Sequence, residues 1–344
     1  MKDVAELAGV SQRTVSNVLG KYPHVTPYTR DRVLAAVEQL GYRPNIAAQQ
    51  LRMGVTKTIA LVLPNLSWPY FGEIAHLVQK EAQRAGYRLL IAETEGSRER
   101  EAAVLSNLGT NLIDGVILSS IELDTKELDD LRIDAPLVLL GEMISGATHP
   151  HYTIDNVEAA RELTWHLHSQ GVRRFALLGA TATKATASAG VLRRAGFEQA
   201  LVEAGVTTSA GTARYDHLPA SPWTAERGRA HVAEWVRRNP LPDAIVALND
   251  LLAAGALRAL SDAEINVPGE VLLTGWDGTV ISKYATPSMT TVSPNKAAIA
   301  QHAVRGLISL IEGNPTPAGD VFVEHSIKIR ESSLPIKTGR EFLD

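Results

Sequence analysis

Three polar side chains near the start of the chain can form hydrogen bonds with the edges of DNA bases. An arginine can pair with guanine through two hydrogen bonds, and a glutamine or asparagine amide can pair with adenine in the same way. The chain offers Gln12, Arg13 and Asn17 for this chemistry. Arg13 and Asn17 are four residues apart, so they would project from the same face of a helix.

The stretch from residue 3 to residue 20 predicts two short helices joined by a tight turn. Gly9 can adopt the positive φ with which a helix ends, and Ser11 can cap the N–H groups of the next helix. Each helix has one apolar face, formed by Val4, Leu7 and Ala8 in the first and by Val15, Val18 and Leu19 in the second. Two helices joined at such a corner form a helix-turn-helix motif, whose second helix enters the major groove of DNA.

A third helix is expected to complete a small all-α head. Thr26 is a suitable N-cap, Pro27 suits the first helical position, and Gly41 ends the helix. The three helices would share a core formed by Val4, Leu7, Val15, Leu19, Val33, Val37 and Leu40. The first helix begins almost at Met1 without a capping side chain, so we expect it to fray or to start further upstream.

A shorter helix is expected between Asn45, which can cap it, and Gly54, which can end it. A helix of about two turns is marginal in water, so this one should form only against a partner. Its narrow apolar stripe suits a second copy of the same helix and is formed by Ala47, Ala48 and Leu51.

Charge is distributed unevenly along the chain. Residues 1–57 contain eight Lys and Arg against four Asp and Glu, whereas the remaining residues contain 26 basic against 34 acidic residues. A basic head on an acidic body suits a head that binds a polyanion.

Length and composition limit the class of protein. A chain of 344 residues exceeds one ordinary domain, and 45% hydrophobic with 21% charged residues is typical of a soluble globular protein. No run of 18 apolar residues and no secretory signal is present. The chain has no cysteine, which excludes disulfides and thiolate metal sites. These features predict a cytoplasmic protein without a membrane span.

From residue 58 onward, short apolar runs alternate with helical stretches. Buried parallel strands joined by crossover helices produce this alternation. Two consecutive sets, separated near Asp155, predict two doubly wound α/β lobes that bind ligands at the carboxyl ends of their strands. The expected strands are 59–63, 89–92, 115–118, 137–140, 175–178, 244–248 and 271–274. The expected helices lie near 70–86, 97–110, 124–131, 157–170, 190–205, 223–238 and 250–262.

The head resembles the DNA-binding domain of the LacI/GalR family of transcription regulators. The matching segments are DVAELAGVSQRTVSNVL, VTPYTRDRVLAAVEQLGYRPN and AAQQLR. The resemblance implies a sequence-specific regulator, a repressor, whose dimer binds a pseudo-palindromic operator. It implies base contacts for Gln12, Arg13 and Asn17 and backbone contacts for Ser11, Thr14, Ser16, Thr29 and Asn45. It assigns Ala48, Leu51 and Arg52 to the minor groove, where Leu51 would wedge between base pairs.

Residues 58–344 resemble the regulatory core of the same family, which has the two-lobed fold of periplasmic sugar-binding proteins (type I). In that fold the chain crosses between lobes three times, so helix 295–312 should return to the first lobe and strand 321–329 to the second. The implied parts are a head (1–43), a hinge and linker (44–57), lobe 1 (about 58–154 and 288–314) and lobe 2 (about 155–287 and 315–335).

The resemblance also implies a small-molecule effector, sugar or sugar-derived, in the cleft between the lobes. Its residues here are Trp68, Tyr70, Phe71, Arg193, Trp223, Asn249 and Asp277. Arginine, asparagine and aspartate bind pairs of hydroxyl groups through charge-assisted hydrogen bonds. The side chains of Trp68, Phe71, Trp223 and Trp276 offer flat apolar faces.

The chain departs from the family pattern at several of these positions. Arginine is common where Asn17 stands, and it is also common where Glu142 stands. The segment Pro294-Asn295-Lys296 is a further departure within the cleft. The family pattern places dimer contacts near 70–84 and 97–110. The sequence shows no leucine-heptad extension of the kind that joins dimers into tetramers, so we expect a dimer.

Two other classes of function fit the α/β core taken alone: a small-molecule (sugar) binding protein without a DNA-directed role, and an α/β enzyme. The first would need a secretory signal and no basic head, the reverse of this chain. No HExxH, GxSxG, P-loop or GxGxxG motif is present. The close histidine pairs are His149 with His151 and His166 with His168. A spacing of two puts both side chains on one face only in a strand, and the second pair lies in an expected helix. The sequence therefore predicts no catalytic residue, no metal and no cofactor.

Overall fold

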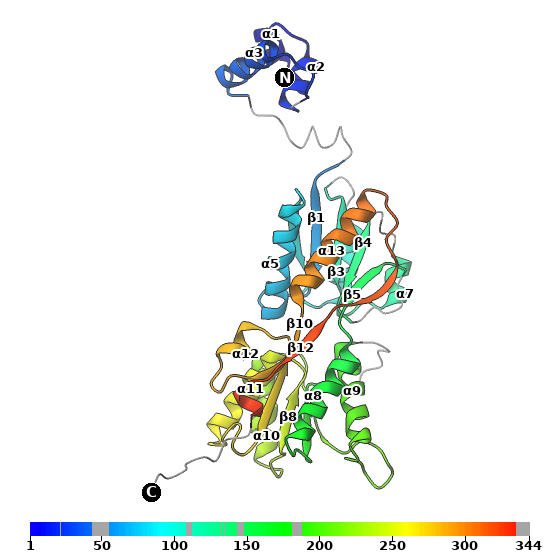
Figure 1. The fold of residues 1–344 in the computed structure, drawn as a ribbon, viewed down its shortest axis with the longest axis vertical. Coiled ribbons are helices and arrows are strands. Elements are labelled where there is room, and N and C mark those ends of the chain that lie inside the picture. Colours follow the sequence, from blue (N-terminus) through cyan, green and yellow to red (C-terminus); the bar gives the residue numbers. More distant parts are fainter. Residues whose placement is uncertain are drawn as a thin grey trace. The chain divides into compact units, whose positions relative to one another are not determined.

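The computed structural model describes residues 1–20, 22–42, 55–107, 112–131, 133, 135–142, 148–180 and 188–334 (Figure 1). The chain divides into two compact units, Met1–Thr56 and Lys57–Asp344, each considered by itself below. The predicted hinge helix, with Asn45, Ala48, Leu51 and Arg52, lies outside the described residues. Within the described residues, no helix is long and apolar enough to cross a bilayer.

The head contains the three predicted helices, α1 (Lys2–Leu7), α2 (Gln12–Leu19) and α3 (Pro27–Gln39). Gly9 has φ +60°, and the Ser11 hydroxyl accepts a hydrogen bond from the Thr14 N–H. The Thr26 hydroxyl caps α3 in the same way, with Pro27 as its first residue. These signals act within one turn of chain, and the predictions based on them are confirmed.

The core of the head differs in membership from the predicted one, and the predicted Leu19 and Val37 pack against it only partly buried. Its buried apolar side chains are Val4, Ala5, Ala8, Val15, Val18, Val33 and Ala36. Leu7 and Leu40, which were expected in this core, are each 47% exposed. Val4, Ala5 and Ala8 define the buried face of α1, and Leu7 falls outside it. Leu40 is the C-cap of α3, beyond the last turn that packs inward.

The first sheet of the core unit is entirely parallel, in the order β11-β5-β4-β3-β1-β2. Its strands are β1 (Thr58–Leu63), β2 (Arg88–Glu93), β3 (Gly115–Ser119), β4 (Leu137–Leu140), β5 (Pro150–Thr153) and β11 (Gly319–Phe322). The helices of this lobe are α5 (Pro69–Arg84), α6 (Arg98–Asn107), α7 (Thr125–Asp130) and α13 (Lys296–Ile311). As predicted, α13 returns to the first lobe, where it packs on α5 and on β3 to β5 (Figure 1).

The second sheet has the order β12-β10-β9-β8-β6-β7, with β12 antiparallel to β10. Its strands are β6 (Phe175–Leu178), β7 (Asp216–Leu218), β8 (Ala244–Ala247), β9 (Leu272–Trp276), β10 (Thr290–Pro294) and β12 (His325–Lys328). Its helices are α8 (Asn156–Ser169), α9 (Ala189–Glu203), α10 (Ala225–Val236), α11 (Asp250–Asp262) and α12 (Val280–Tyr284), with a 3₁₀ turn at Glu331–Ser333. The two doubly wound lobes predicted from the sequence are confirmed.

The predicted positions of two lobe crossings are wrong. Residues 288–314 were expected in lobe 1, but β10 pairs with β9 in the second sheet, so the chain crosses only at the start of α13. Residues 315–335 were expected in lobe 2, but β11 pairs with β5 in the first sheet. Only Val323 and Glu324 separate β11 from β12. The sequence pattern therefore predicted a single strand, 321–329. An apolar run does not specify which sheet receives it, because strand pairing depends on residues far away in sequence.

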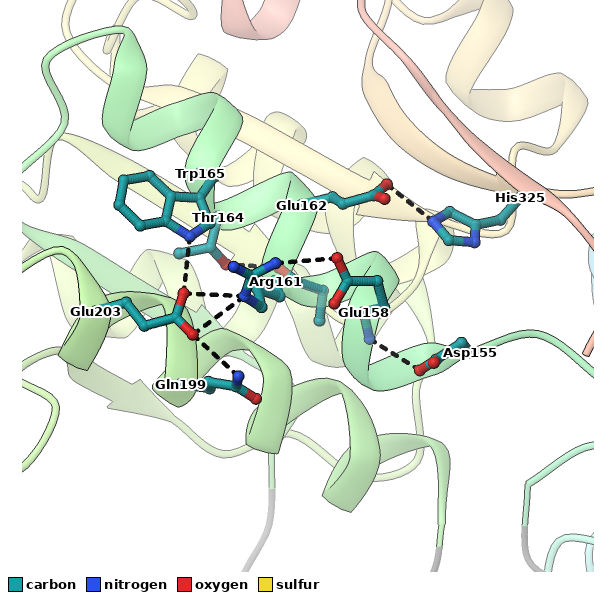
Figure 2. Close-up of polar contacts among 10 residues, drawn as sticks. Asp155, Glu158, Arg161, Glu162, Thr164, Trp165, Gln199, Glu203 and His325 are labelled. Atoms are coloured by element: carbon teal, nitrogen blue, oxygen red, sulfur yellow. Dashed lines mark hydrogen bonds and ion pairs between the residues drawn. The ribbon is translucent and has the colours of Figure 1, made fainter.

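A polar brace holds α8 against α9 (Figure 2). The Glu203 carboxylate accepts hydrogen bonds from the Arg161 guanidinium, the Trp165 indole and the Gln199 amide, at 2.9–3.2 Å. Gly196 allows the backbones to approach closely, since a Cβ on this residue would lie 1.9 Å from the Val157 carbonyl oxygen. The brace matters for function because α9 contributes Arg193 to the cavity described below, and Asn156 of α8 accepts a hydrogen bond from that side chain.

Replacing Gly196 with alanine is expected to destabilise the core unit by about 1–3 kcal/mol, because α8 and α9 must move apart to admit the methyl group. Chemical denaturation of the full-length protein measures this change. Gly205→Ala is the control for an added methyl, since a Cβ at Gly205 has no neighbour within 4 Å, although its φ of +72° adds backbone strain. A Gly196→Ala protein no less stable than Gly205→Ala would contradict the close packing of these helices.

Candidate functional site

The outer face of α2 presents the three predicted base-reading side chains. Gln12 and Arg13 are exposed, Asn17 is partly exposed, and Val15 and Val18 are buried beneath them. None of the three polar side chains forms a hydrogen bond or ion pair with another described residue. Their donors and acceptors are therefore free for a partner molecule.

The residues predicted to contact the DNA backbone lie around this face. Ser11 and Thr14 share a hydrogen bond between their hydroxyls (2.9 Å) at the N-terminus of α2, and Thr26 and Thr29 do the same at the start of α3. Ser16 is partly exposed on α2. Both helix starts thus present hydroxyls and N–H groups, which suit phosphate oxygens. Asn45 lies outside the described residues.

The core unit contains a cavity of about 880 Å³ between its two lobes. All seven residues predicted to bind an effector line this cavity: Trp68, Tyr70, Phe71, Arg193, Trp223, Asn249 and Asp277. The three predicted residues of the first lobe, all aromatic, come from the loop after β1 and the start of α5. In the second lobe, the predicted residues follow β6, β7, β8 and β9 in turn: Arg193, Trp223, Asn249 and Asp277. The carboxyl ends of parallel strands thus converge on one space, as doubly wound folds require.

Arg193 is a buried basic group of the cavity wall, only 6% exposed. Its Nε donates to the Asn156 side chain (2.9 Å) and its Nη1 to the Leu248 carbonyl (2.5 Å). Its Nη2 lies 4.0 Å from the Glu142 carboxylate. The guanidinium carbon lies 4.4 Å from the centre of the Trp276 ring.

Trp276 therefore packs against the Arg193 guanidinium and does not line the cavity. It is 1% exposed, and its ring is covered by the guanidinium. The expectation that Trp276 offers a flat face to the ligand is wrong. Residue type alone cannot separate a tryptophan under an arginine from one that faces a ligand.

Asn249 is largely occupied by contacts within the protein. Its side-chain oxygen caps α11 by accepting the Leu252 N–H (2.8 Å), and its amide nitrogen donates to the Trp223 carbonyl (3.2 Å). The Trp223 indole in turn donates to the Gly179 carbonyl (2.9 Å). Asn249 thus fixes the wall of the cavity and retains one N–H for a ligand.

Asp277 combines backbone strain with a desolvated charge. Its φ is +104°, a conformation rare for a residue with a side chain. Burial raises the pKa of its carboxyl well above the ordinary value, and the opposing charge of Arg193 only partly offsets this. The carboxyl accepts no hydrogen bond from a described residue. Strain and desolvation of this kind concentrate at functional sites.

Asp250, which sequence reasoning did not assign, holds the Asp277 loop in place. Its buried carboxylate accepts hydrogen bonds from the Thr279 N–H (2.7 Å), the Thr279 hydroxyl (2.8 Å) and the Thr291 hydroxyl (2.8 Å). These bonds join the start of α11 to the loop after β9 and to β10. Its position directly after Asn249, at a strand end, was the available signal.

Lys296 joins the two lobes at the same loop. Its ammonium group donates to the carbonyls of Asp277 (2.5 Å) and Gly278 (3.1 Å), and forms an ion pair with Glu73 of α5 (2.8 Å). Glu73 also accepts the Val280 N–H at the start of α12 (3.2 Å). We call Glu73 and Lys296, with these backbone groups, the lobe latch. The sequence marked Lys296 only as a departure from the family pattern.

Replacing Asp277 with asparagine is expected to stabilise the ligand-free protein at neutral pH. The folded-state pKa of Asp277 lies above the unfolded value near 4. Ionising this carboxyl therefore costs stability, and the cost grows as pH rises above that value. We expect a gain of about 2–4 °C in Tm at pH 7, the shift that about 1 kcal/mol produces, and none below pH 4. Thermal melts between pH 4 and pH 8 measure it, and a variant that is less stable throughout would contradict this account.

One histidine of each pair considered as an alternative site contacts other groups of the protein. His151 is buried on β5, where its ring contacts the Asp320 carboxylate (2.7 Å) and the Gly141 carbonyl. His166 contacts the Ser333 hydroxyl (3.0 Å). Among the described residues, no group of three or more His, Asp and Glu side chains is arranged to hold a metal ion.

Comparison with known proteins bears out the resemblance of both units. Residues 1–45 match the model of the bacterial regulatory proteins of the lacI family, and residues 164–333 match that of a periplasmic binding protein-like domain. The HTH-type transcriptional regulator GalS of Salmonella typhimurium (strain LT2) is 34% identical over 307 residues, which are 88% of this chain and 87% of GalS. The chain belongs to the lacI family of bacterial regulatory proteins. It is a DNA-binding transcriptional regulator with a helix-turn-helix head and a periplasmic-binding-protein-like core.

Two solved structures of lacI-family regulators extend the comparison. A crystal structure of the lac repressor dimer bound to operator and the anti-inducer ONPF is 25% identical, with a TM-score of 0.84, and the alignment covers 96% of this chain and 98% of that chain. A complex of the transcriptional regulator CelR with cellobiose is 29% identical, with a TM-score of 0.68 and the same coverage. The family fold thus extends over nearly the whole chain.

Proposed function

We propose that this protein is a cytoplasmic repressor without enzymatic activity. It binds a pseudo-palindromic operator as a homodimer and responds to a sugar-like effector in the cavity between its lobes. The observation that carries this proposal is that one chain combines an α2 face with free polar side chains and a cavity lined by aromatic rings, Arg193 and Asp277.

In this proposal α2 lies in the major groove. Gln12, Arg13 and Asn17 contact base edges, and Ser11, Thr14, Ser16, Thr29 and Asn45 contact the backbone. Ala48, Leu51 and Arg52 of the hinge lie in the minor groove between the half-sites. The lac repressor structure, a dimer bound to operator, supports this arrangement by family membership.

Exposed apolar side chains on both lobes support a dimer. Leu90 and Ile91 lie on the edge strand β2 and are 40% and 38% exposed, beside the predicted contact helices α5 and α6. Val280 and Tyr284 of α12 are also exposed. Apolar side chains on an edge strand normally need a partner to cover them.

The chemistry of the cavity supports an effector with several hydroxyl groups. Aromatic rings from both lobes pack well against the apolar faces of a sugar ring, and charged groups bind its hydroxyls. The CelR–cellobiose complex shows that a relative with this fold binds a disaccharide. The cavity volume of about 880 Å³ is within the range of small-molecule sites.

The lobe latch offers a route from effector to DNA. The backbone carbonyl of Asp277 accepts a hydrogen bond from the Lys296 ammonium. A ligand that binds the Asp277 carboxyl therefore acts on the same residue and shifts the contact between the lobes. Such a shift changes the spacing of the hinges in the dimer, and a hinge helix that folds only against its partner would then melt.

Replacing Lys296 with methionine is expected to remove the effect of the effector on operator affinity, while the protein still binds the effector and the operator. The methionine keeps the aliphatic bulk but lacks the ammonium that joins Glu73 to the Asp277 and Gly278 carbonyls. We expect the effector to change operator affinity by less than about threefold in this variant, against about tenfold or more in the wild type. Fluorescence anisotropy with and without effector measures both ratios. An unchanged ratio would exclude the latch from the response.

Selection of bound sequences from random DNA duplexes by the full-length protein tests the proposed function. We expect an enriched pseudo-palindrome with two half-sites about one helical turn apart. The absence of any enriched sequence would favour a sugar-binding protein or an α/β enzyme without a DNA-directed role.

A further inference from the structure

The charges around the cavity are unbalanced toward the acidic side. Among the described residues that line it, Arg98 and Arg193 are basic. Six are acidic: Glu95, Glu122, Asp124, Glu142, Asp250 and Asp277. The imbalance favours a cationic ligand only if the protein itself engages the basic groups and leaves some of the acidic groups without partners.

Each nearby cation is bound to the protein itself. Arg98 forms an ion pair with Glu127. Arg193 donates to Asn156 and to the Leu248 carbonyl, and the Trp276 ring covers one of its faces. Lys296, which reaches the Asp277 loop, is paired with Glu73. Around the cavity, an anionic ligand would therefore find each described cationic side chain already engaged by the protein.

Three of the acidic groups are likewise engaged. Glu95 pairs with Arg100. Asp124 caps α7 through the Glu127 N–H (2.9 Å). Asp250 is bound by Thr279 and Thr291, as described above. These three carboxylates shape the walls and are satisfied by the protein.

The other three carboxylates have little or no compensation. Glu122 and Asp277 form no ion pair or side-chain hydrogen bond with a described residue. Glu142 accepts one hydrogen bond from the Asn156 amide (3.2 Å), and its charge lies 4.0 Å from the Arg193 guanidinium. Glu142 and Asp277 enter the cavity from opposite lobes. Tyr70 lines the same cavity, where burial and the charges of Glu142 and Asp277 raise the pKa of its hydroxyl.

We infer, on the basis of the proposed function, that the effector is a sugar-like molecule that carries a protonated amine, bound between Glu142 and Asp277. An ammonium group supplies the donors that these carboxylates lack, and it offsets the cost of burying them. The ring of such a ligand packs against Trp68, Phe71 and Trp223. A phosphate or carboxylate on the ligand would add to the uncompensated negative charge, so phosphorylated sugars are rejected.

Matched sugars that differ only in charge test the ligand class. The probes are D-glucosamine, D-glucose and glucose 6-phosphate, and the chitosan disaccharide, cellobiose and cellobiose 6-phosphate. Isothermal titration of the full-length protein is expected to give the tightest binding for the amine in at least one set and no binding for either phosphate. Glu142→Gln should weaken binding of the amine by about tenfold or more, the effect of one charge-assisted hydrogen bond. Glu234→Gln, on the surface of α10 beside Arg238, is the charge-matched control.

Tryptophan quenching tests the charge of the cavity without a ligand. In a Trp165→Phe, Trp235→Phe background, the remaining tryptophans are Trp68 and Trp223, which are partly exposed and line the cavity, and Trp276, which is buried. Caesium should quench their fluorescence more strongly than iodide, each normalised to its quenching of free N-acetyltryptophanamide, because the cavity concentrates cations. Glu142→Gln and Asp277→Asn should each reduce this preference.

The outcomes separate this inference from the proposed function. Tightest binding by a neutral or phosphorylated sugar, or equal quenching by caesium and iodide, overturns the amine-bearing ligand and leaves a sugar-responsive repressor intact. Failure of all six sugars to bind contradicts the carbohydrate effector, and the inference is then lost with it.

Discussion

Replacing Arg13 with alanine is expected to weaken binding to the selected operator by about 30-fold or more. Each lost bidentate contact to a base costs about 1–3 kcal/mol, and a dimer loses two of them. Binding to unrelated DNA should change little, because it depends on phosphate contacts made by other residues. Arg13 is exposed on α2 and has no described partner within the protein, so the substitution should not disturb the fold.

Anisotropy titrations with operator and scrambled duplexes at one salt concentration measure this loss. Lys2→Ala is the matched control, because it removes one positive charge from the head outside α2, where Lys2 lies 4.0 Å from Glu6. A loss of equal size on both duplexes would mean that Arg13 contacts phosphate and does not read a base.

Replacing Arg193 with alanine is expected to weaken effector binding by at least about 100-fold while the head still binds operator. The guanidinium joins Asn156 of α8 to the carbonyl at the end of β8 and lies next to Glu142. Truncating one partner of a buried, hydrogen-bonded charge at a binding site costs about 2–5 kcal/mol of binding free energy, because the remaining groups stay buried without compensation. Lysine should not restore binding, since an ammonium cannot reproduce the planar pair of donors.

Isothermal titration and operator anisotropy on the same preparation measure these two effects. Arg194→Ala is the control, because the neighbouring side chain is 41% exposed and pairs with Glu198 on the surface of α9. An Arg193→Ala protein that keeps full effector affinity would show that the ligand binds elsewhere. One that loses both activities would assign to Arg193 a role in folding only.

The features predicted correctly from the sequence depend on short stretches of chain. The capping of α2 by Ser11, the start of α3 at Pro27 and the turn at Gly9 each follow from residues within one helical turn. The alternating apolar runs predicted β1 to β4, β6, β8 and β9 for the same reason, whereas β5 and β7, which have no such run, were missed. The seven residues around the cavity were assigned through the family resemblance, and the structure brings them to one space.

The features that sequence reasoning missed depend on contacts between distant residues. Placing β10 and β11 in their sheets requires their pairing with β9 and β5, which no local pattern records. The position of Trp276 beneath Arg193 and the capping of α11 by Asn249 depend on how several elements meet. The lobe latch joins Glu73 to Lys296 across more than 200 residues of sequence, and neither residue type alone indicates it.

The central claim is that a ligand in the cavity controls operator binding. The most direct test is the operator affinity of the full-length protein, measured by anisotropy with and without a sugar that raises its Tm. We expect a change of about tenfold or more in operator affinity, and an equal change in sugar affinity when operator is present, because the coupling is reciprocal. A sugar that binds in the cavity and leaves operator affinity unchanged would show that the cavity does not control the head.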